Sequence, residues 1–333
     1  MMLIFSLKKV WKVNNMIVYI YPISLFPDLH SDKIFGAILS TLNDLFPSIT
    51  DTVIKRFKQN NPPFLISSAF PFININNKKI RFYPKILLND ESDFNGDLEI
   101  IKNFDDVKFL QEEIFFDIIN GNLSFNQILN NYGNYFQVDE FLLNQNIDIQ
   151  ELKNFSKRMI VSQNSINRLN NFFKVFYSEG IKYNDVHGLF FHISFFDEGF
   201  IEIFKAVLRL LKDRGFGSKI SIGRGQFSYE LENDDVYKNH NSKFSINNNY
   251  FVTLSRFIPT SDDLKFIDLN SNYELYFKRG IDRFGDFRKQ AIFFSEGSTF
   301  LGNENNFFGK LFDSSENSVE YGFAFNLKIN VIK

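Results

Sequence analysis

The sequence predicts an α+β fold, with a split β-α-β unit in the first part of the chain and a β-rich region in the last part. Three observations support this prediction. Strand-like runs are followed by helical stripes in two places, residues 16–45 and 187–211. The segment between these units, about 85–185, contains amphipathic helical patterns. The last hundred residues contain strand patterns punctuated by glycine, and no helix is evident there.

The first unit begins with residues 16–26, MIVYIYPISLF, which alternate and are rich in β-branched and aromatic residues, as is typical of a strand. Pro27 and Asp28 end this run. Ser31 or Asp32 can cap the helix that follows, and Pro47 is expected to stop it. Its apolar residues repeat at helical spacing: Ile34, Phe35, Ile38, Leu42 and Leu45.

The next predicted strand covers residues 62–73, interrupted by Pro71, and a short basic-aromatic strand or turn covers residues 78–85. Residues 103–120 then predict one amphipathic helix, and residues 121–160 contain further helical fragments. We therefore expect a large helical insertion, about 85–185, between the second and third strands of the first unit.

Residues 187–195 predict a buried strand, and residues 226–231 predict the last strand of the unit. The helix between them has an apolar stripe formed by Phe200, Ile203, Phe204, Val207 and Leu211. Without the insertion, the order is β-α-β followed by β-α-β, which is the ferredoxin-like pattern. We assign residues 16–231 to this N-terminal domain.

Residues 232–249 are polar and rich in asparagine, and we expect them to form a domain boundary. Residues 250–333 form the second, β-rich domain in this prediction. Its strands are expected at four segments: 250–257, 273–280, 289–300 and 321–332.

The composition excludes several kinds of site. The formal net charge is −2 and the sequence pI is about 6.1, so any nucleic-acid surface must be local. There is no cysteine, and no two of the four histidines have the H-E-x-x-H spacing of a zinc helix. We expect no metal and no cofactor. Because the chain contains 44 Phe, a single Phe is weak evidence for base stacking.

No apolar run reaches the ~18–20 residues that span a bilayer. Residues 1–15 have an apolar tip followed by lysines, the reverse of a signal peptide, and we interpret them as an upstream extension or a misassigned start. The expected location is the cytoplasm, with no membrane partner.

Residues 214–227, RGFGSKISIGRGQF, combine four glycines with Lys219 and Arg224. The segment ends a helix and precedes a strand, so it is not a Rossmann fingerprint, and it has no P-loop string. A helix C-cap and a bulged strand entry explain one or two glycines but not four. Glycines let backbone N–H groups approach phosphate oxygens, and nearby cations neutralise charge. The pattern therefore favours contact with an anion or an RNA backbone.

The segment LLKDRGFGSKISIGRGQF (210–227) resembles the C-terminal glycine-rich signature of the RAMP superfamily, the RRM-like proteins of CRISPR effector complexes. Further segments resemble family motifs in the same order: LHSDKIFGAI (29–38), FLISSAFPF (64–72), SINRLN (165–170), EGSTF (296–300) and YGFAF (321–325). In this order they are similar to the fourth-subunit family of type III-A CRISPR Csm complexes. The resemblance covers most of residues 17–330.

The resemblance implies two ferredoxin-like (RRM-like) domains, the first carrying the insertion. It also implies a non-catalytic subunit that holds the repeat-derived 5′ tag of crRNA. Its partners would be the large polymerase-like subunit and a backbone RAMP subunit, and its role antiviral defence. The expected RNA contacts lie in the glycine-rich loop 215–225, just before it, at the start of the first helix and in the N-R motif: Gly215, Gly217, Ser218, Lys219, Gly223, Arg224, Gly225, Arg214, His30, Ser31 and Arg168.

Ile220 and Ile222 depart from the more basic or small residues of the family loop, and they are expected to pack rather than touch RNA. An alternative function is a metal-independent RAMP endoribonuclease that processes crRNA precursor, with His30 as the general base. A structural protein with no RNA contact is a second alternative. His187 and His192 lie five apart on a strand, so they point to opposite faces and are expected to be structural.

Overall fold

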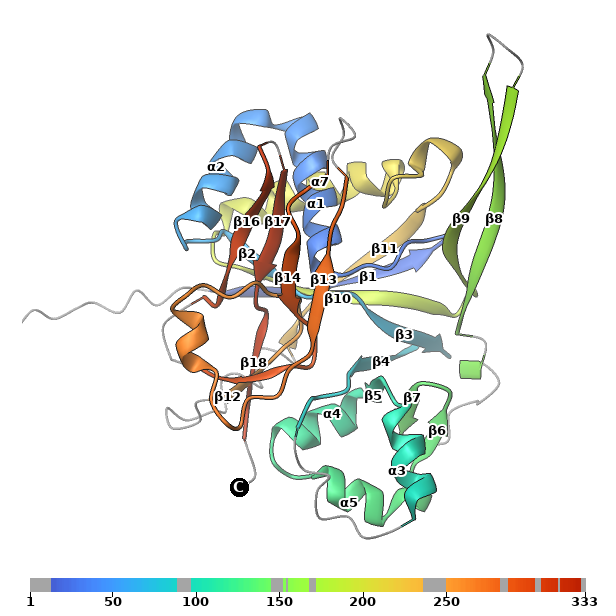
Figure 1. The fold of residues 1–333 in the computed structure, drawn as a ribbon, viewed down its shortest axis with the longest axis vertical. Helices are drawn as coiled ribbons and strands as arrows, with labels where there is room; N and C mark the ends of the chain where they lie inside the picture. The colour runs from blue at the N-terminus through green and yellow to red at the C-terminus, as the bar shows by residue number, and fades with distance from the viewer. Residues whose placement is uncertain are drawn as a thin grey trace, which may run out of the picture.

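The computed structural model of the 333-residue chain describes residues 13–88, 97–144, 152–153, 155–167, 172–235, 250–281, 287–302, 307–316 and 318–330. A body of packed sheets and helices carries one long hairpin that projects from it (Figure 1). The predicted mixed α+β fold is confirmed.

The predicted split β-α-β pattern forms one end of a nine-stranded sheet, with β11 at the edge. Four strands lie side by side in the order β11-β1-β10-β3, all antiparallel to their neighbours: β1 (Asn14–Pro22), β3 (Phe70–Ile75), β10 (His187–Phe195) and β11 (Phe227–Asn233). The short strand β2 (Phe64–Ile66) pairs with the other end of β10. Because Asn14 and Asn15 belong to β1, the first strand begins before the predicted Met16.

Two helices pack against one face of this sheet and against each other: α1 (Ser31–Leu45) follows β1, and α7 (Gly199–Arg214) follows β10. Most residues of the expected apolar stripes are buried; the exceptions are Leu45, which is exposed, and Ile203, which is half-buried, while Leu39 and Leu208 are buried in addition. Phe204 of α7 packs edge to face with Phe195 of β10. Pro47 does not simply end the first helix. It is the first residue of a second helix, α2 (Pro47–Lys58), because proline suits the first turn, where its missing N–H is not needed.

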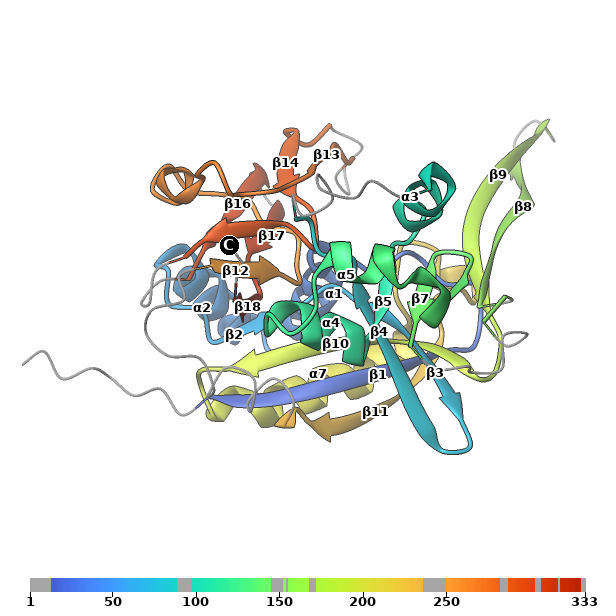
Figure 2. The same cartoon turned by 90° about the horizontal axis from the view of Figure 1, so that it is seen from below.

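The opposite face of the sheet is also covered. The Tyr83 ring, on β4 (Lys78–Pro84), stacks on Phe115 of α4 (Glu112–Ile119) at 4.6 Å between ring centroids. The His192 ring of β10 stacks on Phe325 at 5.8 Å. Figure 2 views the molecule from the side on which α4 lies. RRM proteins stack bases on this face of their sheet. Here the inserted segment and the C-terminal part of the chain occupy it.

The insertion is not purely helical. Besides α4 it contains α3 (Leu98–Asp105) and α5 (Phe125–Asn130), and three short strands extend the main sheet: β5 (Phe109–Gln111), β6 (Phe136–Val138) and β7 (Phe141–Leu143). The prediction of one helix over 103–120 is wrong, because β5 interrupts it to pair with β4. The insertion ends in the antiparallel strands β8 (Ser156–Asn167) and β9 (Phe172–Tyr183), which form the projecting hairpin.

The C-terminal part is β-rich, as expected. Within its described residues the structure has one 3-10 turn, η3 (Asp263–Phe266), and no α-helix. Its strands are β12 (Tyr250–Thr253), β13 (Leu275–Lys278), β14 (Ala291–Phe294), β15 (Thr299–Leu301), β16 (Gly309–Ser315), β17 (Ser318–Phe323) and β18 (Asn326–Ile329).

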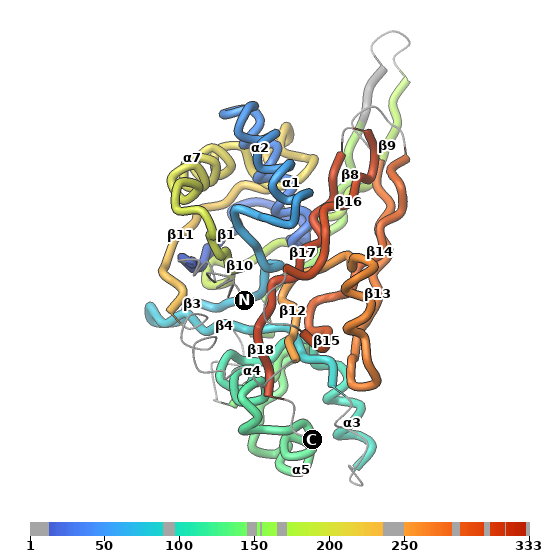
Figure 3. Tube along the Cα trace, turned by 90° about the vertical axis from the view of Figure 1, so that its left-hand side faces the viewer, coloured from blue at the N-terminus to red at the C-terminus, as the bar shows by residue number. Residues whose placement is uncertain are grey.

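The C-terminal strands pack on the helices of the first part, and Figure 3 shows β16 and β17 beside α1. The rings of Phe35 (α1) and Tyr321 (β17) lie 4.9 Å apart, and those of Phe57 (α2) and Phe323 lie 5.4 Å apart. The amide of Ile66 donates a hydrogen bond of 3.1 Å to the Tyr321 hydroxyl. One continuous hydrophobic core therefore contains residues from both parts of the chain.

Candidate nucleic-acid interface

The glycine-rich loop begins where α7 ends. Gly215 has a φ of +90°, and its amide donates to the carbonyl of Leu211 at 2.7 Å. Glycine is common just after the last helical turn, because it adopts a positive φ without a steric cost. This position matches the sequence interpretation of Gly215 as a helix cap.

Two of the four glycines allow the loop to pack on itself. A Cβ on Gly225 would lie 1.9 Å from the carbonyl oxygen of Phe216, and a Cβ on Gly215 would lie 2.9 Å from that of Gly225. The amide of Phe216 donates to Gly225 at 2.9 Å, and the amide of Gly225 donates to Leu25 at 2.9 Å. These glycines close the base of the loop.

The other two glycines have space around them. Gly217 and Gly223 have φ values of +96° and +77°, and a Cβ on Gly223 would meet no atom within 4 Å. They are required by backbone conformation rather than by packing. The amides of Gly217 and Ser218 donate no hydrogen bond to any part of the chain that the structure describes. Free N–H groups on successive residues of a turn form a concave site that attracts anions.

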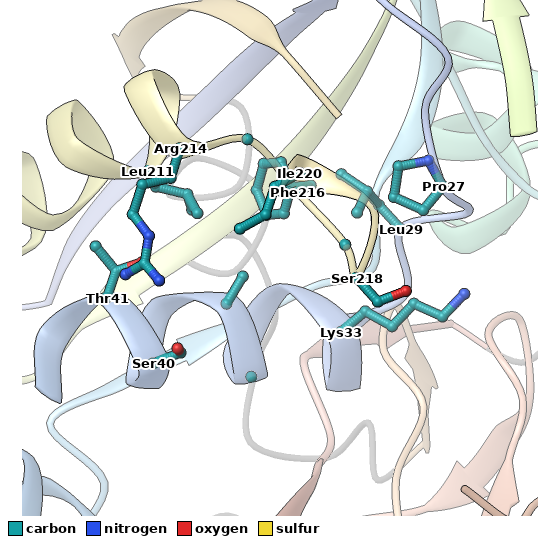
Figure 4. Close-up of a pocket in the computed structure, with 14 residues that line it drawn as sticks. Pro27, Leu29, Lys33, Ser40, Thr41, Leu211, Arg214, Phe216, Ser218 and Ile220 are labelled. Carbon is teal, nitrogen blue, oxygen red and sulfur yellow. The ribbon is translucent and has the colours of Figure 1, made fainter. Parts of the chain in front are cut away.

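The loop faces α1 across a groove of about 460 Å³. Figure 4 shows Lys33 beside Ser218 at one end of the groove, and Arg214 beside Thr41 at the other. Burial lowers the pKa of Lys33, and the nearby carboxylates of Asp28 and Asp32 partly offset that effect. The groove therefore has a cation at each end. The charge of Arg214 is shared with Asp44, with which it forms an ion pair.

Lys219 and Arg224 lie against the β8–β9 hairpin. The Nζ of Lys219 is 3.5 Å from Oε1 of Gln163 and 5.0 Å from the ring centroid of Phe176. Arg224 is 9% exposed, and its Nη1 donates to the carbonyl of Glu179 at 3.1 Å. Arg224 was expected to contact RNA; in this structure its side chain ties the loop to the hairpin instead.

The two isoleucines also differ from the expectation. Ile222 is 52% exposed rather than packed, whereas Ile220 lines the groove. Both belong to a single 3-10 turn, η2 (Ile220–Ile222), which turns successive side chains in different directions.

The hairpin carries exposed apolar and basic side chains. The pairing register puts Ile160, Phe173, Val175 and Tyr177 on one face, and these side chains are 47–73% exposed. The other face carries Lys157, Lys174 and Lys182, which are also exposed. Exposed aromatic side chains of this kind can stack the bases of a single-stranded nucleic acid, and exposed lysines attract its backbone. Sequence analysis missed this feature because the segment was read as helical and irregular.

His30 and Ser31 lie away from the glycine-rich loop, in a polar cluster between the two parts of the chain. Nδ1 of His30 is 2.9 Å from Oε1 of Glu296, and the Ser68 hydroxyl donates to the same oxygen at 2.5 Å. The Arg256 Nε lies 3.6 Å from it. Burial alone would raise the pKa of Glu296, but the contacts with His30, Arg256 and Ser68 outweigh it and lower that pKa to about 2.

Ser31 is buried and does not reach the surface. Its amide donates to the Ser68 hydroxyl at 2.9 Å, and its own hydroxyl accepts the amide of Arg256 at 3.2 Å. The expected RNA contact is therefore corrected to a structural role. His30 is different, because its side chain is 31% exposed and lines a cavity of about 760 Å³ together with Glu296.

Asp32 completes the connection between the two parts of the chain. Its carboxylate accepts a hydrogen bond of 2.5 Å from Lys278, which also donates to Glu320 at 2.6 Å. Arg288 donates to the other oxygen of Glu320 at 2.9 Å. Together with the contacts of Glu296 to His30 and Ser68, these ion pairs hold the C-terminal strands against the start of α1.

His187 and His192 lie on opposite sides of β10, as predicted. The His187 ring packs on Phe155 at 4.8 Å, and Nδ1 of His192 lies 2.5 Å from Oδ2 of Asp234. Nε2 of His192 is 3.1 Å from the hydroxyl of Tyr83, whose pKa is raised by burial. Both histidines are buried and have structural contacts, as expected.

Arg168, an expected RNA contact, and residues 1–12 lie outside the described residues. In the described part of the chain, no three metal-binding side chains gather at one place. Every helix described is too short or too polar to cross a bilayer.

No protein-family model matches the chain. No curated protein matches it by sequence. Solved structures are similar in fold. A chain in the crystal structure of the Csm3-Csm4 subcomplex of the type III-A CRISPR-Cas interference complex aligns with a TM-score of 0.69 and 19% identity, over 95% of this chain and 100% of that one. A chain in the crystal structure of the Csm1-Csm4 cassette in complex with cA4 aligns with a TM-score of 0.57 and 18% identity, over 96% of this chain and 99% of that one. The chain therefore shares the fold of these chains of type III-A CRISPR-Cas structures, as the motifs predict.

Proposed function

We propose that this chain is the RNA-binding, non-catalytic subunit of a type III-A CRISPR effector complex that holds the 5′ tag of crRNA. In this role it joins the large polymerase-like subunit to the backbone RAMP subunits in antiviral defence. The observation that carries the proposal is the fold likeness, which extends over 95% of this chain and the full length of its neighbour in a Csm3-Csm4 subcomplex. Neighbours in Csm1-Csm4 cassettes support the second partner.

The glycine-rich loop supports the RNA contact. The free amides of Gly217 and Ser218 and the ammonium of Lys33 provide donors for one phosphate. Lys219 extends the positive charge from the loop to the hairpin, because it lies over Phe176 of β9. The RRM-like sheet face is covered, so the RNA is expected to follow the groove and the hairpin instead.

The experiment measures binding of the full chain to a short fluorescein-labelled single-stranded RNA of mixed sequence as salt is varied. Each lost phosphate contact reduces the slope of log K against log salt by about 0.7 for a single strand. Lys33→Gln combined with Lys219→Gln should therefore reduce the slope by about 1.4. The control is Lys55→Gln combined with Lys102→Gln, because both lysines are exposed and neither lines the groove.

Wild-type protein that binds no RNA, or a slope equal in both double variants, would refute the RNA-binding role. Membership of the complex is tested separately, by co-expression with a Csm1-type and a Csm3-type subunit. If the chain is recovered with neither subunit, its proposed membership of the complex is refuted.

An endoribonuclease is the second candidate, and the His30–Glu296 pair is the observation that favours it. The carboxylate of Glu296, whose pKa is lowered, accepts a hydrogen bond from Nδ1 of His30 and so orients the imidazole, as a carboxylate orients the histidine of a general acid–base pair. Incubation of the protein with repeat RNA in EDTA decides between the two. Cleavage that His30→Ala abolishes would establish the enzyme and refute the non-catalytic role.

A further inference from the structure

A glycine lies in the interior of α1 without a structural reason for it. Gly36 is the sixth residue of Ser31–Leu45, and its φ is not positive. A Cβ at this position would meet no atom within 4 Å among the described residues. Glycine destabilises a helix interior relative to alanine. Neither the backbone nor the packing of the described chain requires it here.

Gly36 lies on the floor of the groove between α1 and the glycine-rich loop. Its helical neighbours on the same floor, Ala37 and Ser40, are also small. Small residues at adjacent positions leave a hollow in the helix surface. The missing side chain therefore keeps this hollow open.

The walls of the hollow are mainly apolar, and its ends are polar. Leu29, Leu211, Phe216 and Ile220 line it. At one end, the Lys33 ammonium lies beside Ser218, next to the free amides of residues 217 and 218 (Figure 4). An apolar slot with phosphate-binding groups at its mouth has the chemistry of a nucleotide: a flat ring with an anion at one end.

We infer that the groove receives one unstacked base of a single-stranded RNA, with the ring over Gly36 and a neighbouring phosphate on Lys33 and the amides of Gly217 and Ser218. The inference rests on the proposed RNA-binding function and adds to it a base pocket and one residue, Gly36. A volume of about 460 Å³ is in the range of small-ligand pockets, which hold a molecule of nucleotide size.

The test compares Gly36→Ala and Gly36→Leu with wild type. Two probes are used: the labelled mixed-sequence RNA, and an oligomer of equal length whose central nucleotides lack bases. Gly36→Ala should raise the melting temperature and weaken RNA binding severalfold. Gly36→Leu fills the hollow and should weaken RNA binding at least tenfold while leaving binding of the abasic oligomer within twofold. The control is Gly133→Leu, at an exposed glycine of the insertion that also has no neighbour within 4 Å.

Three results would overturn the inference. Gly36→Leu could bind RNA as wild type does, while the lysine double variant still loses salt dependence; the proposed function would then stand without the base pocket. Gly36→Leu could weaken the binding of both oligomers equally; the groove would then hold the RNA backbone and no base. If the wild type bound neither oligomer, the proposed function and the pocket would both be refuted.

Discussion

The imidazole of His30 and the carboxylate of Glu296 are 266 residues apart in the sequence, yet Nδ1 and Oε1 lie 2.9 Å apart. His30 immediately precedes α1, and Glu296 lies between β14 and β15 of the C-terminal part. Ser68, from the strand region of the first part, donates to the same carboxylate oxygen. This cluster joins three segments that the sequence shows only as separate motifs.

The first prediction concerns acid stability. The pKa of Glu296 is lowered from 4.5 to about 2 in the folded protein, so its stabilising contribution is complete above about pH 5 and is lost as the pH falls towards 2. The contribution is on the order of 3 kcal/mol. Glu296→Gln should destabilise the protein at neutral pH, and its difference from wild type should disappear near about pH 2.

Urea unfolding of both proteins across this pH range measures that difference. Glu202→Gln is the control, because Glu202 forms an exposed i,i+3 pair with Lys205. A Glu296→Gln difference that stays constant from neutral to acid pH would contradict the prediction.

The fold of the first part could be predicted because its signals are local. The apolar stripes of α1 and α7 and the buried strand 187–195 each appear within one short window. The break at β5 was missed because residues 109–111 fit a helical stripe as well as a strand. Their pairing with β4 decides the outcome, and β4 lies 25 or more residues earlier.

The candidate site could be predicted only in part for a similar reason. Four glycines identify the loop, but the direction of Arg224 depends on the carbonyl of Glu179, in a hairpin that was not predicted. Ser31 was misassigned because its burial comes from the contact of its hydroxyl with Arg256, 225 residues away. Lys33 and Gly36 were missed because a groove is visible only after α1 and the loop are placed together.

The second prediction concerns the ion-pair network at the start of α1. Burial alone would lower the pKa of Lys278, but Asp32 and Glu320 raise it. Lys278→Met leaves the buried carboxylate of Asp32 without this cation, whereas Glu320 keeps Arg288. We expect a loss of about 3 kcal/mol in the free energy of unfolding, the lower end for breaking a buried pair. Lys265→Met, which removes an exposed pair with Asp262, should cause no measurable change. Equal stabilities of the two variants would show that the network contributes nothing.

The third prediction separates the glycines of the loop. Gly223→Ala introduces only the cost of a left-handed φ, about 1 kcal/mol. Gly225→Ala adds a collision with the carbonyl oxygen of Phe216 and should lower the free energy of unfolding by more than about 2 kcal/mol. Chemical denaturation of the two variants measures this difference. Similar losses for both would mean that the base of the loop can open without a penalty.

The last prediction concerns the connection between the loop and the hairpin. Arg224 is the buried cation that donates to Glu179 of β9, so Arg224→Met removes a charge-assisted hydrogen bond while keeping most of the apolar stem. The hairpin projects from the body (Figure 1), to which it is also joined by the Phe26–Ile181 bridge and the Arg158–Asp28 ion pair. Loss of the Arg224 bond should therefore make local opening more frequent while global stability changes little. Limited proteolysis should cut residues 155–183 severalfold faster than in wild type. Lys212→Met removes an exposed cation from the last turn of α7 and should leave the cutting rate unchanged. If Arg224→Met and wild type are cut at the same rate, the Arg224 hydrogen bond does not hold the hairpin in place.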